Sequence, residues 1–444
     1  MQSLTNFKKI VSGSFLNHLH KNSYISWRKF PSDKTSKDKY LEALYHKIVR
    51  GLYTPLFPRD YVVSNKHNFV ARIVPSLTLD DYCVYYYCIK SIEKYLAINR
   101  IEGTFGGFRL GGEFRKREDK EFNELQEISF SISPFTYNPL AWTKAWRDFQ
   151  KKARIYSADR TYSYFLKFDI ANYYNTINLS ILEPKVRIAS PKEYTDEIDL
   201  LFFFLKYWNK RFLKYSEQTI SIPQDEVGDC SRLLANFYLQ DYDKAIFDAS
   251  INVNCRYMRY ADDQILMADK KETAEDLLFY ASKELFKLGL NINSAKVERF
   301  TRNEWEYYWC FDIFDLLGNP NNITNIEKSI DRILILDKDK CRFDSILKRV
   351  LNCDVGSVSI DKKIKFLSLV INDDFLLNID SRLIIAIYRL LGQKEKGKYL
   401  YKLRQLSNIA RFNSYHYNLL RAKRNGLPIN FTTEIHQKIE ALKL

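Results

Sequence analysis

The pattern of apolar and polar positions predicts strands set between helical stretches. Residues 61–76, YVVSNKHNFVARIVPS, carry β-branched runs on either side of a polar centre, which predicts a hairpin. Residues 80–98 open with two acids and continue with apolar residues at helical spacing, which predicts an acid-capped helix. Further along, residues 164–168 and the two halves of YMRYADDQILMA at 257–268 predict three buried strands, the last two joined by a tight turn.

Residue patterning and composition divide the chain into three regions. Residues 1–160 mix helical patches, the hairpin and a glycine-rich segment, GTFGGFRLGG at 103–112. That segment lacks the ending and the spacing of a phosphate-binding motif, so a packed loop is the favoured interpretation. Residues 161–315 hold the three strands, and residues 316–444 have apolar positions at helical spacing interleaved with Lys and Arg.

Composition narrows the class of partner. The 444 residues carry 69 Lys and Arg against 54 Asp and Glu, a net charge of +15, which favours a polyanionic partner such as nucleic acid. Seven scattered cysteines without a CxxC pair predict neither a disulfide framework nor a zinc ribbon, and they favour a reducing compartment. Because no apolar run approaches the roughly 20 residues that a membrane helix needs, we expect a cytoplasmic protein without a membrane segment.

Three acids stand where predicted strands end. Asp169 directly follows the strand 164–168, and Asp262 and Asp263 occupy the turn of the later hairpin. An isolated Asp-Asp pair is usually ordinary turn chemistry. If the strands are neighbours, however, Asp169 and Asp262 converge and repel each other unless divalent cations neutralise them. Two Mg²⁺ ions, or Mn²⁺, would do so and would support two-metal phosphoryl transfer.

Four motifs in order give this arrangement a family resemblance. FLKFDIANYYNTI begins at 165, PQ at 223 precedes SRLLAN, YADD begins at 260 and LGLNINSAK begins at 288. Together they resemble the palm domain of reverse transcriptases, over about residues 60–310. The resemblance implies an α+β right-hand polymerase: fingers over 1–160, a palm with an antiparallel sheet and helices on one face over 161–315, and an α-helical basic thumb or accessory domain over 316–444.

The resemblance also implies roles for residues at the metal site. Asp169 and Asp262 match the two-metal carboxylates, Ile170 the residue whose backbone carbonyl contacts an ion, and Asp263 a weaker, supporting acid. Tyr174 matches the aromatic residue that collides with a 2′-hydroxyl, which implies deoxynucleotides; the alternative is that Tyr173 and Tyr174 simply pack the start of a helix.

Further positions match residues around the nucleotide. Arg72 resembles a fingers arginine that grips the triphosphate, with an exposed strand arginine as the alternative. Gln224 would lie against the nascent base pair. Lys296 resembles a lysine near the triphosphate, with a plain lysine at a helix end as the alternative.

Two departures from the family pattern concern template and primer. Asp225 and Glu226 replace a glycine that lets the backbone approach the base pair, which puts conventional template handling in question. The primer-grip turn is represented at best by WCFDIF at 309–314.

The closest subgroup by resemblance is the bacterial abortive-infection and defence-associated reverse transcriptases. It implies anti-phage defence with dNTPs, a DNA product and a non-coding RNA that serves as template or scaffold. Open alternatives are template-independent, protein-primed synthesis, a group II intron or retron-like enzyme, RNA-directed RNA synthesis and a non-catalytic RNA scaffold. A homo-oligomer also stays open. The expected RNA contacts are Arg115, Lys116, Arg117, Arg421, Lys423 and Arg424.

Overall fold

The computed structural model describes residues 1–444 except 26, 28, 66–69, 98–99, 108–109, 111–141, 210–220, 225–226, 228 and 443–444, and except the side chains of 142–144. The described chain forms two compact units, one of Met1–Arg59 and Pro75–Arg302, the other of Asp60–Val74 and Asn303–Leu444. The division into fingers, palm and thumb at residues 160 and 315 stays a prediction. None of the helices in the described parts has the length and apolarity that a membrane span needs.

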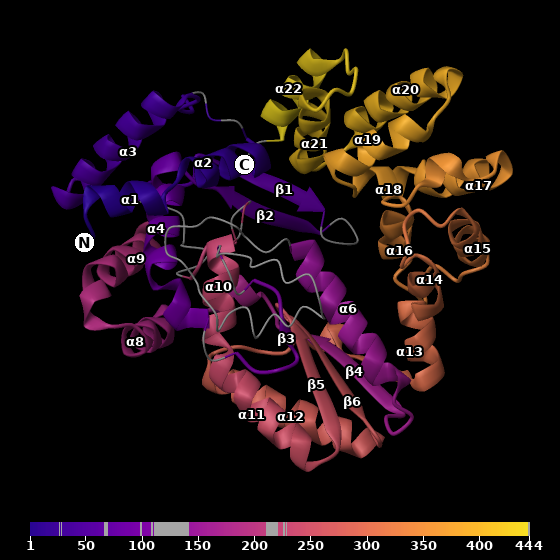
Figure 1. Cartoon of the computed structure of the whole chain (residues 1–444), viewed down its shortest axis with the longest axis horizontal. Helices are drawn as coiled ribbons and strands as arrows, with labels where there is room; N and C mark the ends of the chain where they lie inside the picture. The colour runs from indigo at the N-terminus through magenta and orange to yellow at the C-terminus, as the bar shows by residue number, and fades with distance from the viewer. Residues whose placement is uncertain are drawn as a thin grey trace. The chain divides into compact units, whose positions relative to one another are not determined.

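The first unit contains a five-stranded sheet with strand order β3-β5-β6-β4-β7. Strands β3, β5, β6 and β4 lie side by side in Figure 1. All neighbouring strands are antiparallel except β3 and β5, which run parallel. The expected antiparallel sheet is therefore confirmed apart from one short edge strand, which the glycine-rich segment supplies. The strands are β3 (Thr104–Phe105), β4 (Tyr164–Asp169), β5 (Cys255–Tyr260), β6 (Asp263–Ala268) and β7 (Glu298–Thr301).

Helices cover both faces of this sheet, which corrects the expectation of helices on one face only. Successive side chains of a strand point to opposite faces. On β5, Tyr257 donates a hydrogen bond to Asp243 of α11 (Gln240–Asn252), whereas Tyr260 packs edge-on against Trp146 of α6 (Trp142–Ala158) on the other face. The amphipathic α6 buries Ala145, Phe149 and Ala153 at helical spacing.

Several of the remaining helices of the first unit pack against the apolar α4 (Leu79–Ala97), which is buried along most of its length. The expected acid cap is corrected, because Thr78 caps this helix and the acids lie in its first turn: the Asp81 backbone N–H donates to Thr78 Oγ1, and the Asp81 carboxylate accepts from the same hydroxyl. The other helices are α1 (Leu4–Ile10), α2 (Gly13–Asn22), α3 (Lys34–Val49), α7 (Tyr173–Thr176), α8 (Leu179–Ala189), α9 (Thr195–Tyr207), α10 (Asp229–Tyr238) and α12 (Lys271–Lys287), with short 3-10 turns η1 (Lys192–Tyr194) and η2 (Ser294–Lys296).

The second unit joins the predicted hairpin to the C-terminal helices. Strands β1 (Asp60–Asn65) and β2 (Ala71–Ser76) form the expected two-stranded sheet. The buried Asn413 accepts a hydrogen bond from the Val63 N–H at 2.7 Å and donates one to the Tyr61 carbonyl at 3.0 Å. The helices are α13 (Arg302–Trp309), α14 (Phe311–Leu316), α15 (Ile323–Leu334), α16 (Phe343–Val350), α17 (Ile360–Val370), α18 (Asp373–Leu377), α19 (Ser381–Leu390), α20 (Gln393–Ile409), α21 (Asn413–Arg424) and α22 (Thr432–Ala441), with the 3-10 turn η3 (Val355–Ser357).

Candidate functional site

Three acids meet at one edge of the central sheet. Strand β4 ends at Asp169, which pairs in register with Asp263, the first residue of β6. Because Tyr260 also pairs with Asp263, only Ala261 and Asp262 form the turn between β5 and β6. The expectation that the two strands are neighbours is therefore confirmed, and the carboxyl groups of Asp169, Asp262 and Asp263 lie at the same sheet edge.

The electrostatics of this edge suit a cation. Burial, together with the nearby carboxylates of Asp263 and Asp169, raises the pKa of Asp262 to about 7. Asp169 is 6% exposed, and its Oδ2 atom forms an ion pair with the Lys296 ammonium on η2. Its Oδ1 atom is buried with no hydrogen-bond partner among the described residues. A buried, unpaired carboxylate oxygen is costly unless a cation or water binds it.

The oxygen ligands at this end of the sheet suit a hard divalent cation. Carboxylate and carbonyl oxygens are the ligands that Mg²⁺ prefers, and Mg²⁺ is commonly held by one or two carboxylates plus substrate phosphates. In the described parts of the chain, no group of three or more His, Cys, Asp or Glu side chains stands in ligand geometry. The candidate oxygen ligands here are the carboxylates of Asp169 and Asp262, with the buried Ile170 backbone following directly on the chain.

The two tyrosines after Asp169 have different surroundings. Asn172, in the left-handed region with φ of 46°, turns the chain into the short helix α7. Tyr173 is 3% exposed and donates its hydroxyl to the Ala235 carbonyl, so it packs the core. Tyr174 is half-buried, with its ring 5.5 Å from that of Tyr173. Of the pair, Tyr174 is the more accessible to a ligand.

A polar chain holds the loop that carries Gln224. The Tyr85 hydroxyl on α4 lies 3.0 Å from Ser231 Oγ, which donates to the Pro223 carbonyl at 2.5 Å. Ser231 is the serine of the SRLLAN motif, so the motif serine has a structural task here. Gln224 follows and is half-buried, whereas Asp225 and Glu226 lie outside the described residues.

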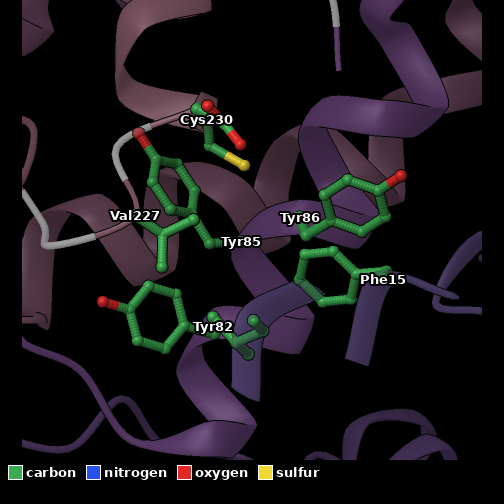
Figure 2. Close-up of a pocket in the computed structure, with 8 residues that line it drawn as sticks. Phe15, Tyr82, Tyr85, Tyr86, Val227 and Cys230 are labelled. Atoms are coloured by element: carbon green, nitrogen blue, oxygen red, sulfur yellow. The ribbon is translucent and has the colours of Figure 1, made fainter. Parts of the chain in front are cut away.

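A cavity of about 20 Å³ lies beside these hydrogen-bonded residues, and it is lined by Tyr82, Tyr85, Tyr86 and Phe15 (Figure 2). Phe15 stacks on Tyr86 with ring centroids 3.8 Å apart. The cavity has room for about one water molecule, so it holds no nucleotide.

The other predicted contacts belong to the second unit or lie outside the described residues. Arg72 is exposed on β2 and belongs to the second unit. Arg421, Lys423 and Arg424 lie in the last turn of α21, where Lys423 donates to Thr432 Oγ1 at 2.6 Å. Cations at a helix C-terminus are also favoured by the helix dipole, which is a structural explanation for them. The predicted basic contacts Arg115, Lys116 and Arg117 lie outside the described residues.

Sequence reasoning missed a buried ionic network behind the turn. Arg259 is fully buried and forms a two-pronged pair with Asp243, with Nε to Oδ1 at 2.7 Å and Nη2 to Oδ2 at 2.5 Å. A signal was available: in CRYMRY, Arg259 shares the inward face of a buried strand with Cys255 and Tyr257, and a charge there requires a partner.

The glycine-rich segment packs against the same turn, as the packed-loop interpretation predicts. Gly103, Gly106 and Gly107 all have positive φ. A Cβ on Gly103 would stand 2.7 Å from the Tyr257 carbonyl oxygen, and one on Gly107 would stand 2.6 Å from Arg232 Cβ. Only glycine therefore allows this segment to approach β5 and α10 so closely.

Comparison with known proteins places these observations in a family. Residues 120–371 match the model of the family described as reverse transcriptase (RNA-dependent DNA polymerase). No curated protein sequence matches the chain. Among solved structures, apo telomerase from Candida tropicalis is 9% identical, with 92% of this chain and 71% of that chain covered and a TM-score of 0.34. Telomerase from Candida albicans in complex with a telomeric RNA fragment is 11% identical, with 91% and 68% covered and a TM-score of 0.36.

Proposed function

We propose that this chain, which belongs to the reverse transcriptase (RNA-dependent DNA polymerase) family and is therefore a nucleotidyltransferase, extends a 3′-hydroxyl with deoxynucleotides at the sheet edge of Asp169 and Asp262. One observation carries the proposal. The register of β4 against β6 brings Asp169 beside the turn that holds Asp262, so two carboxylates converge on one point.

In this mechanism the protein contributes position and charge. Asp169, Asp262 and the Ile170 carbonyl would hold two Mg²⁺ or Mn²⁺ ions, and Asp263 would support them from the start of β6. Such ions supply activation of the 3′-hydroxyl and neutralisation of the triphosphate. Lys296, already paired with Asp169, would stand beside the triphosphate.

Three further residues would select and hold the nucleotide. Tyr174 would exclude a 2′-hydroxyl by contact with its ring, and Gln224 would lie against the nascent base pair. Arg72 would bind the triphosphate as a two-pronged donor.

The biological setting that we propose is anti-phage defence with a structured non-coding RNA. Its support is the motif resemblance to bacterial defence-associated reverse transcriptases and the net charge of +15. A second candidate is template-independent, protein-primed synthesis at the same site. The observation that favours it is Asp225 and Glu226, two acids in place of the glycine that normally allows close approach of the base pair.

Primer extension on a defined RNA template, with dNTPs and Mg²⁺, tests the reaction. Asp169→Asn and Asp262→Asn should each lower the rate by roughly 10³-fold or more, because a lost ligand charge removes metal stabilisation of the transition state. RNA association should be retained, since the basic surface is unchanged. Parental rates in either variant would refute the assignment. Sequencing the nucleic acid that co-purifies with the protein separates a dedicated RNA from template-free synthesis.

A further inference from the structure

The turn that carries Asp262 is strained. Ala261 has a φ of 53°, in the left-handed region, at the first position of a two-residue hairpin turn. Glycine is the residue that normally occupies such a position, because a Cβ there crowds the backbone. A non-glycine residue keeps this conformation only when its surroundings impose it.

Arg259 is the side chain that contacts the strained residue. Its Nη1 atom donates to the Ala261 carbonyl at 2.6 Å, across two residues of the same hairpin. The turn has a further backbone contact, since the Ala261 N–H donates to the Phe105 carbonyl at 3.4 Å. Arg259 therefore contacts the carbonyl of the peptide immediately before Asp262, whereas the longer bond to Phe105 belongs to the preceding peptide.

Arg259 is itself held from two helices. The carboxylate of Asp243 on α11 accepts from Nε and Nη2, and Asn236 Oδ1 on α10 accepts from Nη1 at 2.7 Å. Asn236 also donates to the Gly106 carbonyl at 2.7 Å, which links the network to the glycine-rich segment. All of these side chains are buried, so the guanidinium has a single arrangement.

We propose that Arg259 is the positioning residue of this turn: it imposes the left-handed conformation of Ala261 and thereby fixes the place of the Asp262 carboxylate. The inference rests on the proposed function in so far as Asp262 acts in catalysis. Only a guanidinium can bind all three acceptor groups at once, because they lie around one planar group. A lysine ammonium lacks the guanidinium's planar, forked set of N–H donors.

The competing explanation is that Arg259 and Asp243 only stabilise the core. Ala261 offers a way to separate the two, since glycine adopts a positive φ without a Cβ clash. If Arg259 works by imposing that conformation, Ala261→Gly should repair the loss of Arg259. If Arg259 only stabilises the core, glycine in the turn repairs nothing.

The experiment compares the parent, Arg259→Lys, Ala261→Gly and the double variant, with Arg256→Lys on the same strand as a matched control. Arg256 is exposed and donates to the Tyr162 hydroxyl. The readouts are kcat and KM for dNTP, binding of Mn²⁺ alone by electron paramagnetic resonance, and thermal unfolding. Arg259→Lys should lower kcat by about 100-fold, the size expected for a catalytic group misplaced by about 1 Å, with little change in KM.

Adding Ala261→Gly to Arg259→Lys should restore kcat by about 10-fold or more and return Mn²⁺ affinity towards the parental value. A double variant no better than Arg259→Lys, or an Arg259→Lys variant as active as the parent, would overturn the proposal. If Arg259→Lys does not fold, Asn236→Ala removes one acceptor and leaves the pair with Asp243, and the same rescue is expected. If the parent makes no DNA, the proposed function fails, while Mn²⁺ affinity still decides the positioning role.

Discussion

At the scale of single residues, the charge of Asp262 opposes folding when no cation is present. Asp262 has a pKa of about 7 in the folded protein, well above the ordinary value of 3.8, because burial and two neighbouring carboxylates disfavour its charge. A carboxyl group with a raised folded pKa binds its proton more tightly in the folded state than in the unfolded one. The stability it contributes is present below about pH 4 and is lost as the pH rises towards 7.

Because the folded protein raises the pKa of Asp262, we predict that Asp262→Asn stabilises the metal-free protein. In the presence of a chelator, the variant should exceed the parent by about 1–3 kcal/mol in free energy of unfolding at pH 8, with the gap closing towards pH 4. Thermal and denaturant unfolding across this pH range measure it. Added Mg²⁺ should raise the stability of the parent and reduce the gap. Asp248→Asn, an exposed acid on α11, is the control. A gap that does not change with pH would contradict the assignment.

The neighbouring tyrosines make a second prediction about one residue. Tyr174→Ala should raise incorporation of ribonucleotides relative to deoxynucleotides by roughly 10- to 100-fold, the discrimination that one packed contact can give. Steady-state kcat/KM for matched dNTP and NTP measures the ratio. Tyr173→Phe removes only the hydroxyl that donates to the Ala235 carbonyl and should leave selectivity unchanged. If Tyr174→Ala discriminates as strongly as the parent, the gate lies elsewhere and Tyr173 becomes the candidate.

At the scale of elements, the hairpin of β1 and β2 depends on one buried amide. Asn413 has no exposed surface and bonds the Val63 N–H and the Tyr61 carbonyl, two backbone groups of the same strand. Its side-chain amide bonds β1 as the backbone of a neighbouring strand would, with one acceptor and one donor. The hairpin that carries Arg72 is therefore tied to α21, at the other end of the sequence.

We predict that Asn413→Ala loosens this hairpin. Losing both bonds should lower the free energy of unfolding of the second unit by about 1–3 kcal/mol, because buried backbone groups are left unpaired. Hydrogen exchange should show faster exchange of the Val63 amide, with the strands of the central sheet unaffected. Asn425→Ala, at an exposed position just after α21, is the matched control. Unchanged protection of Val63 would mean that the hairpin does not depend on Asn413.

The elements differ in how far the sequence could predict them. Strands β4, β5 and β6 and the meeting of Asp169 with Asp262 follow from short apolar runs and acids at strand ends, which are local signals. Strand β3 could not be predicted in this way, because its two residues join the sheet through glycines whose close contacts with β5 and α10 are long-range. The partner of Arg259 was equally hidden, since Asp243 lies on a helix whose packing no local pattern specifies.

At the scale of the whole molecule, charge is the property that exceeds the needs of a nucleotide site. A net charge of +15 is far more than one dNTP requires, and it suits a partner that presents many phosphates. Two accounts compete with a dedicated RNA: the charge serves only the primer-template duplex, or it aids solubility. Each predicts a different response to reversing charges on the second unit.

We predict that Arg421, Lys423 and Arg424 hold a structured RNA. Reversing these three charges to Glu should lower the amount of co-purifying RNA more than it lowers extension of a supplied short primer-template. The dependence of RNA affinity on salt should also become shallower, by about 0.7 to 0.9 in log–log slope for each phosphate that the variant no longer binds. Reversing Lys394, Lys396 and Lys398 on α20 changes the net charge equally and is the control.

Equal loss of RNA binding and extension, or full cellular activity of nuclease-treated protein without RNA, would exclude a dedicated RNA. Template-free, protein-primed synthesis would then be the better account, because it needs the acids of the sheet edge and no bound RNA.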